Sequence, residues 1–214
     1  MSIRSQRDLE VQLSRLKNFE NPSLELEQYA TPSHIAAEWI WTMAMKREVA
    51  GKTILDAACG PGILGIGLLL MGARKVFFVD KDRGTMNSCV ENYNQIKEEY
   101  EVGEALFVTG DISTFDEQVD IVVQNPPFGT KTEHADKKFL EKALAIAVIV
   151  YSMHKYSTQR FVEAIAHDFG FTITDFWRFE FPIKAAFKFH EKPKVMIDVG
   201  LWRMEKMVPP VIIK

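Results

Sequence analysis

The sequence predicts an α/β protein built on a mainly parallel sheet. Short apolar runs rich in Val, Ile and Phe alternate with amphipathic helical patterns from residue 52 onward. Such alternation is typical of parallel strands joined by right-handed helical crossovers. The last two β-rich stretches are joined by a loop with no helical pattern, which predicts an antiparallel pair at one edge. We therefore expect a seven-stranded, mainly parallel sheet with an antiparallel C-terminal strand and helices on both faces.

The first part of the chain predicts a helical N-terminal extension. Residues 5–17 carry apolar side chains at helical spacing, and the Asn-Pro pair that ends at Pro22 breaks this pattern. A second helix is expected over 33–43, with Thr31 or Ser33 as its N-cap. The expected domains are this extension, 1–50, which closes over the ligand site, and the main domain, 51–214.

Within the main domain the elements follow in regular order. Glycine, proline and acidic residues separate the apolar runs, so that each run has a defined beginning and end. The expected strands are 53–56, 75–80, 105–108, 120–123, 148–152, 172–181 and 194–202. The expected helices of this domain are 63–71, 85–100, 133–147 and 157–168.

Composition excludes several classes of protein. The chain has 214 residues, is 47% apolar and has a net charge of −3, so any nucleic-acid contact must rest on a local basic patch. Cys59 and Cys89 are too few for a disulfide scaffold or a zinc site. The N-terminus does not resemble a signal peptide, and the apolar stretch 143–151 is too short to span a bilayer. We expect a cytoplasmic protein, with a nuclear location also open if the source is eukaryotic.

A turn rich in small residues follows the first predicted strand. It reads from Asp56 through Ala58, Gly60 and Pro61 to Gly62, and its glycines do not have the spacing of a dinucleotide-binding turn. It also has no Lys-Ser or Lys-Thr pair of a phosphate-binding loop. Small residues let the backbone approach a ligand closely. The turn therefore predicts a site where a ligand comes close to the backbone.

Acidic residues end the next two strands as well. Asp80 suits the two hydroxyl groups of a ribose, and Asp111-Ile112 suits an adenine amino group and ring. Asp82 lies two residues beyond Asp80 and is a weaker candidate. Helix capping, which contributes about 1 kcal/mol, is the structural alternative for Asp56 and Asp80. Capping explains each acid separately but not the series of three, which predicts a nucleoside-containing cofactor.

The fourth predicted strand ends abruptly at Asn125-Pro126-Pro127-Phe128. Two prolines cannot donate ladder hydrogen bonds, so the strand stops where ligands bind in open α/β sheets. The Asn125 side-chain oxygen and the Pro126 carbonyl can accept the two protons of a planar amino group, and the Phe128 ring can stack on a base. The run predicts methylation of an amino nitrogen, with adenine favoured. The structural alternative is a rigid turn with a core phenylalanine.

These motifs resemble those of the class I S-adenosylmethionine-dependent methyltransferases, which have a Rossmann-like fold. The glycine turn is similar to the first motif of that family, and Asn-Pro-Pro-Phe to its motif for planar amino groups. The resemblance implies S-adenosylmethionine as the cofactor, no metal, and cofactor contacts from the backbone of Ala58, Pro61 and Ile63. Ala58 departs from the pattern, because the family often has glycine there.

Four segments in order narrow the resemblance to the methyltransferase-like protein 5 family. They are 27–32 (Glu-Gln-Tyr-Ala-Thr-Pro), 125–131, 151–155 and 187–190. The resemblance implies N6-adenosine methylation of small-subunit ribosomal RNA and a small zinc-binding activator of the Trm112 type. It also implies that Gln28 and Thr31 close over the cofactor near its methionine end.

The predicted loop 182–193 is the best local basic patch. Lysines alternate there with Phe187 and Phe189, so that Lys188, Phe189 and His190 are candidates for RNA contact, together with Lys155. A solvated loop is the alternative for this patch. His154 can face the crevice or RNA, but a structural role is the commoner one for a lone histidine.

Two other functions stay open at this point. A glutamine-N5 protein methyltransferase uses a similar Asn-Pro-Pro-Tyr tip, although Phe128 and the basic loop favour RNA. A non-catalytic RNA-binding scaffold is also possible, but it would not require Asp56, Asp80 and Asn125. The strand 76–79 is either internal or, if it adjoins an edge, part of a docking surface for the activator.

Overall fold

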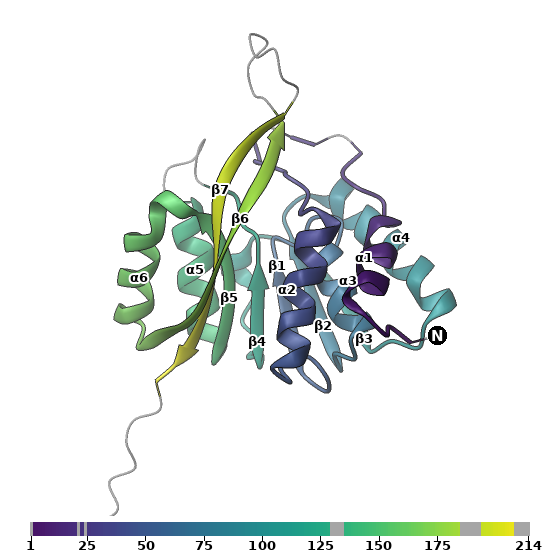
Figure 1. Cartoon of the computed structure of the whole chain (residues 1–214), viewed down its shortest axis with the longest axis horizontal. Coiled ribbons are helices and arrows are strands. Elements are labelled where there is room, and N and C mark those ends of the chain that lie inside the picture. The colour runs from purple at the N-terminus through teal and green to yellow at the C-terminus, as the bar shows by residue number, and fades with distance from the viewer. Residues whose placement is uncertain (1, 21, 24, 129–134, 185–193, 208–214) are drawn as a thin grey trace, which may run out of the picture.

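The computed structural model describes residues 2–20, 22–23, 25–128, 135–184 and 194–207. Its described strands form one seven-stranded sheet in the order β3-β2-β1-β4-β5-β7-β6 (Figure 1). The strands are β1 Thr53–Ala57, β2 Lys75–Asp80, β3 Glu104–Thr109, β4 Ile121–Gln124, β5 Ile149–Lys155, β6 Phe171–Lys184 and β7 Lys194–Lys206. β1 to β5 are parallel, and β7 runs antiparallel to β5 and β6. The predicted fold is therefore confirmed.

Helices cover both faces of the sheet. α1 Gln6–Ser14, α2 Ser33–Met45, α3 Ile63–Leu70 and α4 Arg83–Glu99 share one apolar cluster. The 3₁₀ turn η1 Ile112–Thr114 and the helices α5 Ala135–Ile146 and α6 Gln159–Asp168 share another cluster on the opposite face. Every residue of β1 and β4 is buried, because both faces of these central strands are covered. Neighbouring residues such as Ile54 and Leu55 belong to opposite clusters, as the alternation of a strand requires.

The N-terminal helices pack into the same core as the main domain. α1 lies on α2 and α3, with Leu9 and Leu13 buried (Figure 1). A Cβ on Gly67 of α3 would lie only 2.4 Å from the Ile40 side chain, so the glycine permits this close approach. The proposed division at residue 50 thus falls inside one continuous apolar cluster.

Three local expectations need correction. Pro32 is the N-cap of α2 and makes no side-chain cap bond, so neither Thr31 nor Ser33 caps this helix. β5 continues to Lys155 rather than ending at 152, and His154 is consequently buried, with 1% of its surface exposed. The 3₁₀ turn η2, Tyr156–Thr158, precedes α6 in place of its expected first turn.

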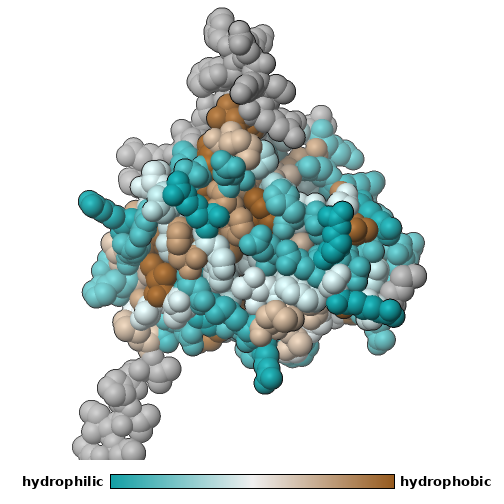
Figure 2. Space-filling model, viewed as in Figure 1, coloured by the Kyte–Doolittle hydropathy of each residue, from teal (hydrophilic) through white to brown (hydrophobic). Residues whose placement is uncertain are grey.

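The β6–β7 hairpin is longer than expected and rises beyond the other strands (Figure 1). Apolar residues gather along it on the face shown in Figure 2. Trp177 and Phe179 of β6 are half-buried beside Tyr151. No helix in the described ranges is long and apolar enough to cross a membrane.

The order of the strands places two predicted motifs side by side. β1 leads outward to β2 and β3, whereas β4 leads the other way to β5, so the direction of winding reverses between β1 and β4. Ala57 at the end of β1 is in register with Gln124 at the end of β4. The glycine turn and Asn125 therefore begin at the same edge of the sheet, at the switch point where α/β proteins bind their ligands.

Candidate active site

The turn after β1 is built from residues with a positive φ. Gly60 and Gly62 have φ of 54° and 90°, and a Cβ on Gly62 would lie 2.5 Å from the Cys89 Sγ. Ala58 also has a left-handed φ, 56°. This conformation explains why glycine is usual at that position, since it costs an L-residue with a side chain about 1–2 kcal/mol. Ala58 adopts this left-handed conformation in spite of its side chain.

Asp56 is buried beneath this turn, with 1% of its surface exposed. Its Oδ2 accepts a hydrogen bond from the Gly65 N–H at 2.8 Å, in the first turn of α3. Burial raises the pKa of Asp56 to about 8, and the nearby Asp80 carboxylate adds to the rise. The carboxyl therefore carries a proton at neutral pH in the free protein. The capping alternative is partly right for Asp56, because it satisfies an N–H of the first turn of α3.

Asp80 lies at the end of β2 and joins two turns. Its Oδ2 accepts from the Gly60 N–H at 3.0 Å, and its Oδ1 from the Asp82 N–H at 2.9 Å. Burial raises the pKa of Asp80. Asp82, rather than Asp80, is the N-cap of α4, and its Oδ1 accepts from the Thr85 N–H. The capping alternative therefore fails for Asp80.

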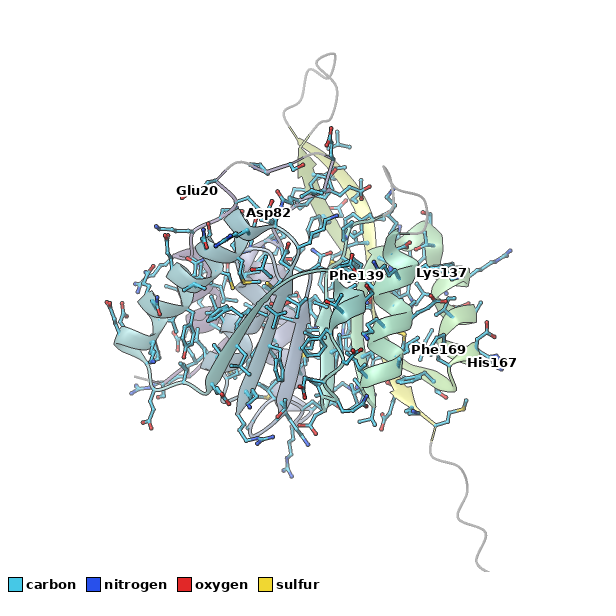
Figure 3. The ribbon with its side chains drawn as sticks, turned by 180° about the vertical axis from the view of Figure 1, so that it is seen from behind. Glu20, Asp82, Lys137, Phe139, His167 and Phe169 are labelled. Atoms are coloured by element: carbon cyan, nitrogen blue, oxygen red, sulfur yellow. The ribbon has the colours of Figure 1, made fainter. Side chains whose placement is uncertain are left out.

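Asp111 and Ile112 follow β3 at the same edge. The Asp111 carboxylate pairs with Lys138 of α5 and accepts from Ser113, and the lysine is the main cause of its lowered pKa. Ile112 is buried. Lys138 and Phe139 were not predicted, because a helix pattern alone does not show which of its residues face a site. Figure 3 shows Asp82 at the upper edge of the sheet and Phe139 on the flank of α5 that is turned toward the strands.

Two cavities lie side by side at this edge. The larger one, about 520 Å³, is lined by the glycine turn, Asp56, Ile63 and the hairpin residues Pro182 and Ile183. The smaller one, about 240 Å³, is lined by Asp80, Asp111, Ile112, Pro127 and Phe139. Both cavities share Phe19, Gln28, Tyr29, Ala58 and Asn125. The two cavities thus bring all the predicted cofactor residues to one crevice, and Asn125 lines both halves.

The segment 25–32, called the strap below, closes one side of both cavities. The Gln28 Nε2 donates to the Asp82 Oδ2 at 3.1 Å and to the Thr85 Oγ1 at 3.3 Å, and its Oε1 accepts from the Ser23 N–H. Gln28 therefore ties the strap to the start of α4. Upstream of the strap, Phe19 covers Gly60, where an added Cβ would lie 2.8 Å from its ring.

Asn125 projects from the end of β4 against the strap. Its Nδ2 donates to the Thr31 Oγ1 at 3.0 Å, while its buried Oδ1 has no hydrogen-bond partner within the described ranges. Phe128 is 6% exposed and stacks on Tyr29, with ring centroids 6.4 Å apart and an interplanar angle of 17°. Phe128 also forms a T-shaped pair with Phe181, with the ring centroids 5.9 Å apart. Stacking of Phe128 on a base stays a prediction, and its partner Tyr29 is half-buried and lines both cavities.

A buried polar chain lies behind this tip. The Gln124 Nε2 donates to the Ser152 Oγ at 2.8 Å, and the Ser152 Oγ lies 2.7 Å from the His154 Nε2. The His154 Nδ1 lies 3.4 Å from the Asp136 Oδ2, in the first turn of α5. Of the two alternatives for His154, the structural one is therefore correct.

The structure describes only one of the four candidates for RNA contact. Lys155 ends β5 at the same edge as Asn125, and its side chain is half-buried. Lys188, Phe189 and His190 lie outside the described residues. No group of three or more His, Cys, Asp or Glu side chains suited to a metal occurs in the described part of the chain.

Comparisons with known proteins agree with this geometry. Residues 38–149 match the methyltransferase small domain family. The rRNA N(6)-adenosine-methyltransferase Mettl5 of Drosophila melanogaster is 35% identical over 207 residues, which cover 93% of this chain and 95% of the relative. A crystal structure of a proposed RNA methyltransferase from Pyrococcus horikoshii is 36% identical, with a TM-score of 0.87, and the match covers 96% of this chain and 100% of that one.

A more distant structure shares the fold alone. It is the magnesium protoporphyrin IX methyltransferase of Synechocystis with bound S-adenosylmethionine, which is 14% identical with a TM-score of 0.65 and covers 92% of this chain and 90% of that one. The cofactor of this class of enzyme is S-adenosylmethionine. The protein is a class I methyltransferase that belongs to the methyltransferase small domain family and, within it, to the methyltransferase-like protein 5 family.

Proposed function

We propose that the protein methylates the N6 amino group of an adenosine in small-subunit ribosomal RNA. The observation that carries this proposal is the Asn125 amide, which lines both cavities and whose buried Oδ1 has no hydrogen-bond partner in the described part of the chain. A buried acceptor without a partner is costly and calls for a donor from a ligand. The names of the curated relatives support ribosomal RNA as the source of that donor.

The two cavities fit the two ends of S-adenosylmethionine. In the smaller cavity Asp80 would accept from the ribose hydroxyls, while Asp111, Ile112 and Phe139 would hold the adenine. In the larger cavity Asp56 and the backbone of the glycine turn would hold the amino-acid end. Bound there, the cofactor supplies a methyl group activated by a positively charged sulfur.

The residues of this chain would contribute to the reaction by holding and polarising the amino group that receives the methyl group. The lone pair of an adenine amino nitrogen is shared with the ring, which makes it a poor nucleophile. The Asn125 Oδ1 and the Pro126 carbonyl would accept hydrogen bonds from its two N–H groups, which favours a tetrahedral nitrogen with its lone pair free. The nitrogen would lose one of these protons readily once it has received the methyl group. Pro126 and Pro127 keep these acceptors rigid, because each fixes its own φ. Positioning and preorganised acceptors can together lower the barrier by roughly 7–11 kcal/mol.

Aromatic rings lie beside the Asn125 side chain. Tyr29 and Phe128 stack on each other next to Asn125, and Pro182 and Ile183 of the hairpin complete the wall of the larger cavity. A base taken out of its RNA helix would gain about 1–3 kcal/mol by stacking on such a ring. Lys155, together with Lys188, Phe189 and His190, would contact the RNA around that base.

The test is transfer of a radiolabelled methyl group to unmodified small-subunit ribosomal RNA and, separately, to ribosomal proteins and release factors. We expect label in RNA, recovered as N6-methyladenosine after digestion. Asn125→Ala should lower kcat by roughly 10²–10³-fold, as removal of a single preorganised polar group does in other enzymes. Its affinity for the cofactor, measured by calorimetry, should stay within a few fold of the wild type.

Other outcomes of this test point to other functions. Label confined to a glutamine of a protein would establish the glutamine-N5 reaction instead. Cofactor binding without transfer to any acceptor would favour the scaffold. Asn87→Ala, at an exposed position of α4, serves as the control and should leave transfer unchanged.

We further propose that a small zinc-binding activator of the Trm112 type docks on β3. Within the described residues β3 pairs only with β2, so one of its edges is open, whereas β2 is internal and cannot itself extend the sheet. The apolar residues of β3, 105–108, are all half-buried. An open edge with half-buried apolar side chains suits a partner that adds a strand.

A further inference from the structure

The Asn125 side chain is bound to a segment outside its own strand. Its Nδ2 donates to the Thr31 Oγ1 at 3.0 Å, and its Oδ1 is buried without a partner among the residues that the structure describes. An amide has nearly the same shape after a rotation of 180°, so hydrogen bonds alone decide which end faces the cavity. The Thr31 hydroxyl can donate as well as accept, so what it supplies is a partner for the buried Nδ2, without which the orientation seen here would leave that N–H group unsatisfied.

The orientation of the Asn125 amide matters for binding of the substrate amino group. With the nitrogen on Thr31, the oxygen is free to accept from an amino group. After the rotation the amide would present its own N–H groups to the N–H groups of the substrate, and two donors cannot bond to each other. The amide therefore has to be held with its oxygen toward the position of the substrate amino group before the substrate binds.

We propose that Thr31 is a positioning residue that fixes the Asn125 amide for methyl transfer; this inference rests on the proposed function. Thr31 is itself 6% exposed, so its hydroxyl acts where water does not compete. This assignment differs from the expected role of Thr31 as a cofactor contact.

The strap holds Thr31 in place from both sides. Downstream, the Ala36 N–H donates to the Pro32 carbonyl at the start of α2. Upstream, Gln28 is bound to Asp82 and Thr85 of α4, and the Asp82 N–H in turn donates to Asp80. A continuous series of hydrogen bonds and four residues of chain therefore connects the ribose-binding candidate Asp80 to the catalytic candidate Asn125.

The first measurement uses the free protein and needs no RNA. The side-chain NH₂ pair of Asn125 is assigned in a ¹⁵N-labelled sample as the pair missing from Asn125→Ala. In Thr31→Val, which keeps the shape of the side chain but removes the hydroxyl, these protons should exchange with water roughly tenfold faster, as expected for loss of one hydrogen bond. Thr31→Ser keeps the hydroxyl and should retain the slow exchange. Thr42→Val, the same change at a half-buried position of α2, is the control.

The second measurement is methyl transfer to RNA. We expect kcat of Thr31→Val to fall roughly 10- to 100-fold, because a buried Nδ2 without an acceptor disfavours the productive orientation by about that factor. The cofactor Kd and the RNA KM should stay within about threefold, and Thr31→Ser should recover most of kcat. Thr31→Ala provides the same loss of hydroxyl if the valine variant folds poorly.

The two proposals fail in different ways. Unchanged exchange of the Asn125 NH₂ pair in both Thr31→Val and Thr31→Ala overturns the positioning role, even if the wild type methylates RNA. Weaker cofactor binding by more than tenfold at unchanged kcat returns Thr31 to a cofactor contact and likewise overturns it. A wild type that transfers no methyl group to RNA overturns the proposed function, while the exchange measurement still reports whether Thr31 holds Asn125.

Discussion

A single buried carboxyl, Asp56, makes the site sensitive to pH. It lies under the glycine turn with one hydrogen bond, from the Gly65 N–H, and with the acidic Asp80 nearby. One donor does not offset the loss of hydration, so burial raises the pKa of Asp56 to about 8. The free protein therefore keeps a proton here that the unfolded chain loses near pH 4.

The stability of the free protein should consequently fall as pH rises. Between about pH 4 and pH 8 the folded state holds one proton more at Asp56 than the unfolded state, so this residue lowers the free energy of unfolding by about 1.4 kcal/mol per pH unit. Asp56→Asn removes this titration and keeps an oxygen for the Gly65 N–H. Urea unfolding of both proteins at pH 5, 6, 7 and 8 should show a difference in stability that grows with pH in favour of the variant. A difference that is the same at every pH would contradict the raised pKa.

At the scale of elements, α4 anchors the N-terminal region to the cofactor turn. The Asn92 Oδ1 accepts from the Lys17 N–H at 2.8 Å, and its Nδ2 donates to the carbonyls of Lys17 and Pro61, each at 2.9 Å. Asn92 is 1% exposed. At the other end of this region Asp82 and Thr85, at the start of α4, hold Gln28. One helix thus fixes both the strap and the turn beneath it.

Replacement of Asn92 by leucine should separate these elements. The change keeps the volume of the side chain but leaves the backbone groups of Lys17 and Pro61 without partners. We expect the free energy of unfolding to fall by about 1–3 kcal/mol or more, as for other buried polar groups left unpaired. Asn87→Leu, at an exposed position of the same helix, is the matched control. Equal urea midpoints for the two variants would show that Asn92 does not anchor the N-terminal region.

The buried polar chain behind Asn125 connects the end of β4 and the start of α5 to β5. Gln124 precedes the catalytic run, and Asp136 begins α5 after it. Gln124 is hydrogen-bonded to Ser152 of β5, and Asp136 lies beside His154 of the same strand. Ser152 and His154 are in turn hydrogen-bonded to each other. The two ends of the segment that leaves the catalytic tip are thereby attached to one strand.

At the scale of the whole molecule, the sheet has open edges among its described strands at β3 and β6. They differ in character. The apolar residues of β3 are all half-buried, whereas along β6 the half-buried Trp177 and Phe179 alternate with exposed side chains such as Phe176 and Arg178. An activator that adds a strand at β3 would bury its continuous run of half-buried apolar residues.

The proposed docking can be tested with one charge at each edge. Leu106→Lys places a charge among the half-buried apolar residues of β3, and we expect it to abolish co-purification with a Trm112-type protein. Thr172→Lys, at an exposed position of β6, should leave binding unchanged. A complex that forms equally well with Leu106→Lys would exclude β3 as the docking edge, and no complex with the wild type would remove the partner.

Much of the fold and the site could be predicted from local patterns. The apolar runs and the prolines after Gln124 defined the strands, because periodicity and backbone restriction are local properties. Thr31, Gln28 and His154 were harder to predict. Their roles depend on residues that are 94, 54 and 18 positions away in the chain, respectively, and no local pattern identifies such a partner. For the same reason Lys138 and Phe139 were missed as part of the site.

The sequence by itself determined the class of protein and the chemistry available to it. Its motifs required a turn of small residues, acids at strand ends and a proline-stiffened asparagine, because each of these depends on the residue type at one position. Only the tertiary structure decided how they act together. It brought the ends of β1 and β4 into register, turned the Asn125 amide against Thr31 and buried Phe128 against Tyr29. These features depend on which segments pack side by side, and packing between distant segments is settled by the burial of the whole apolar core.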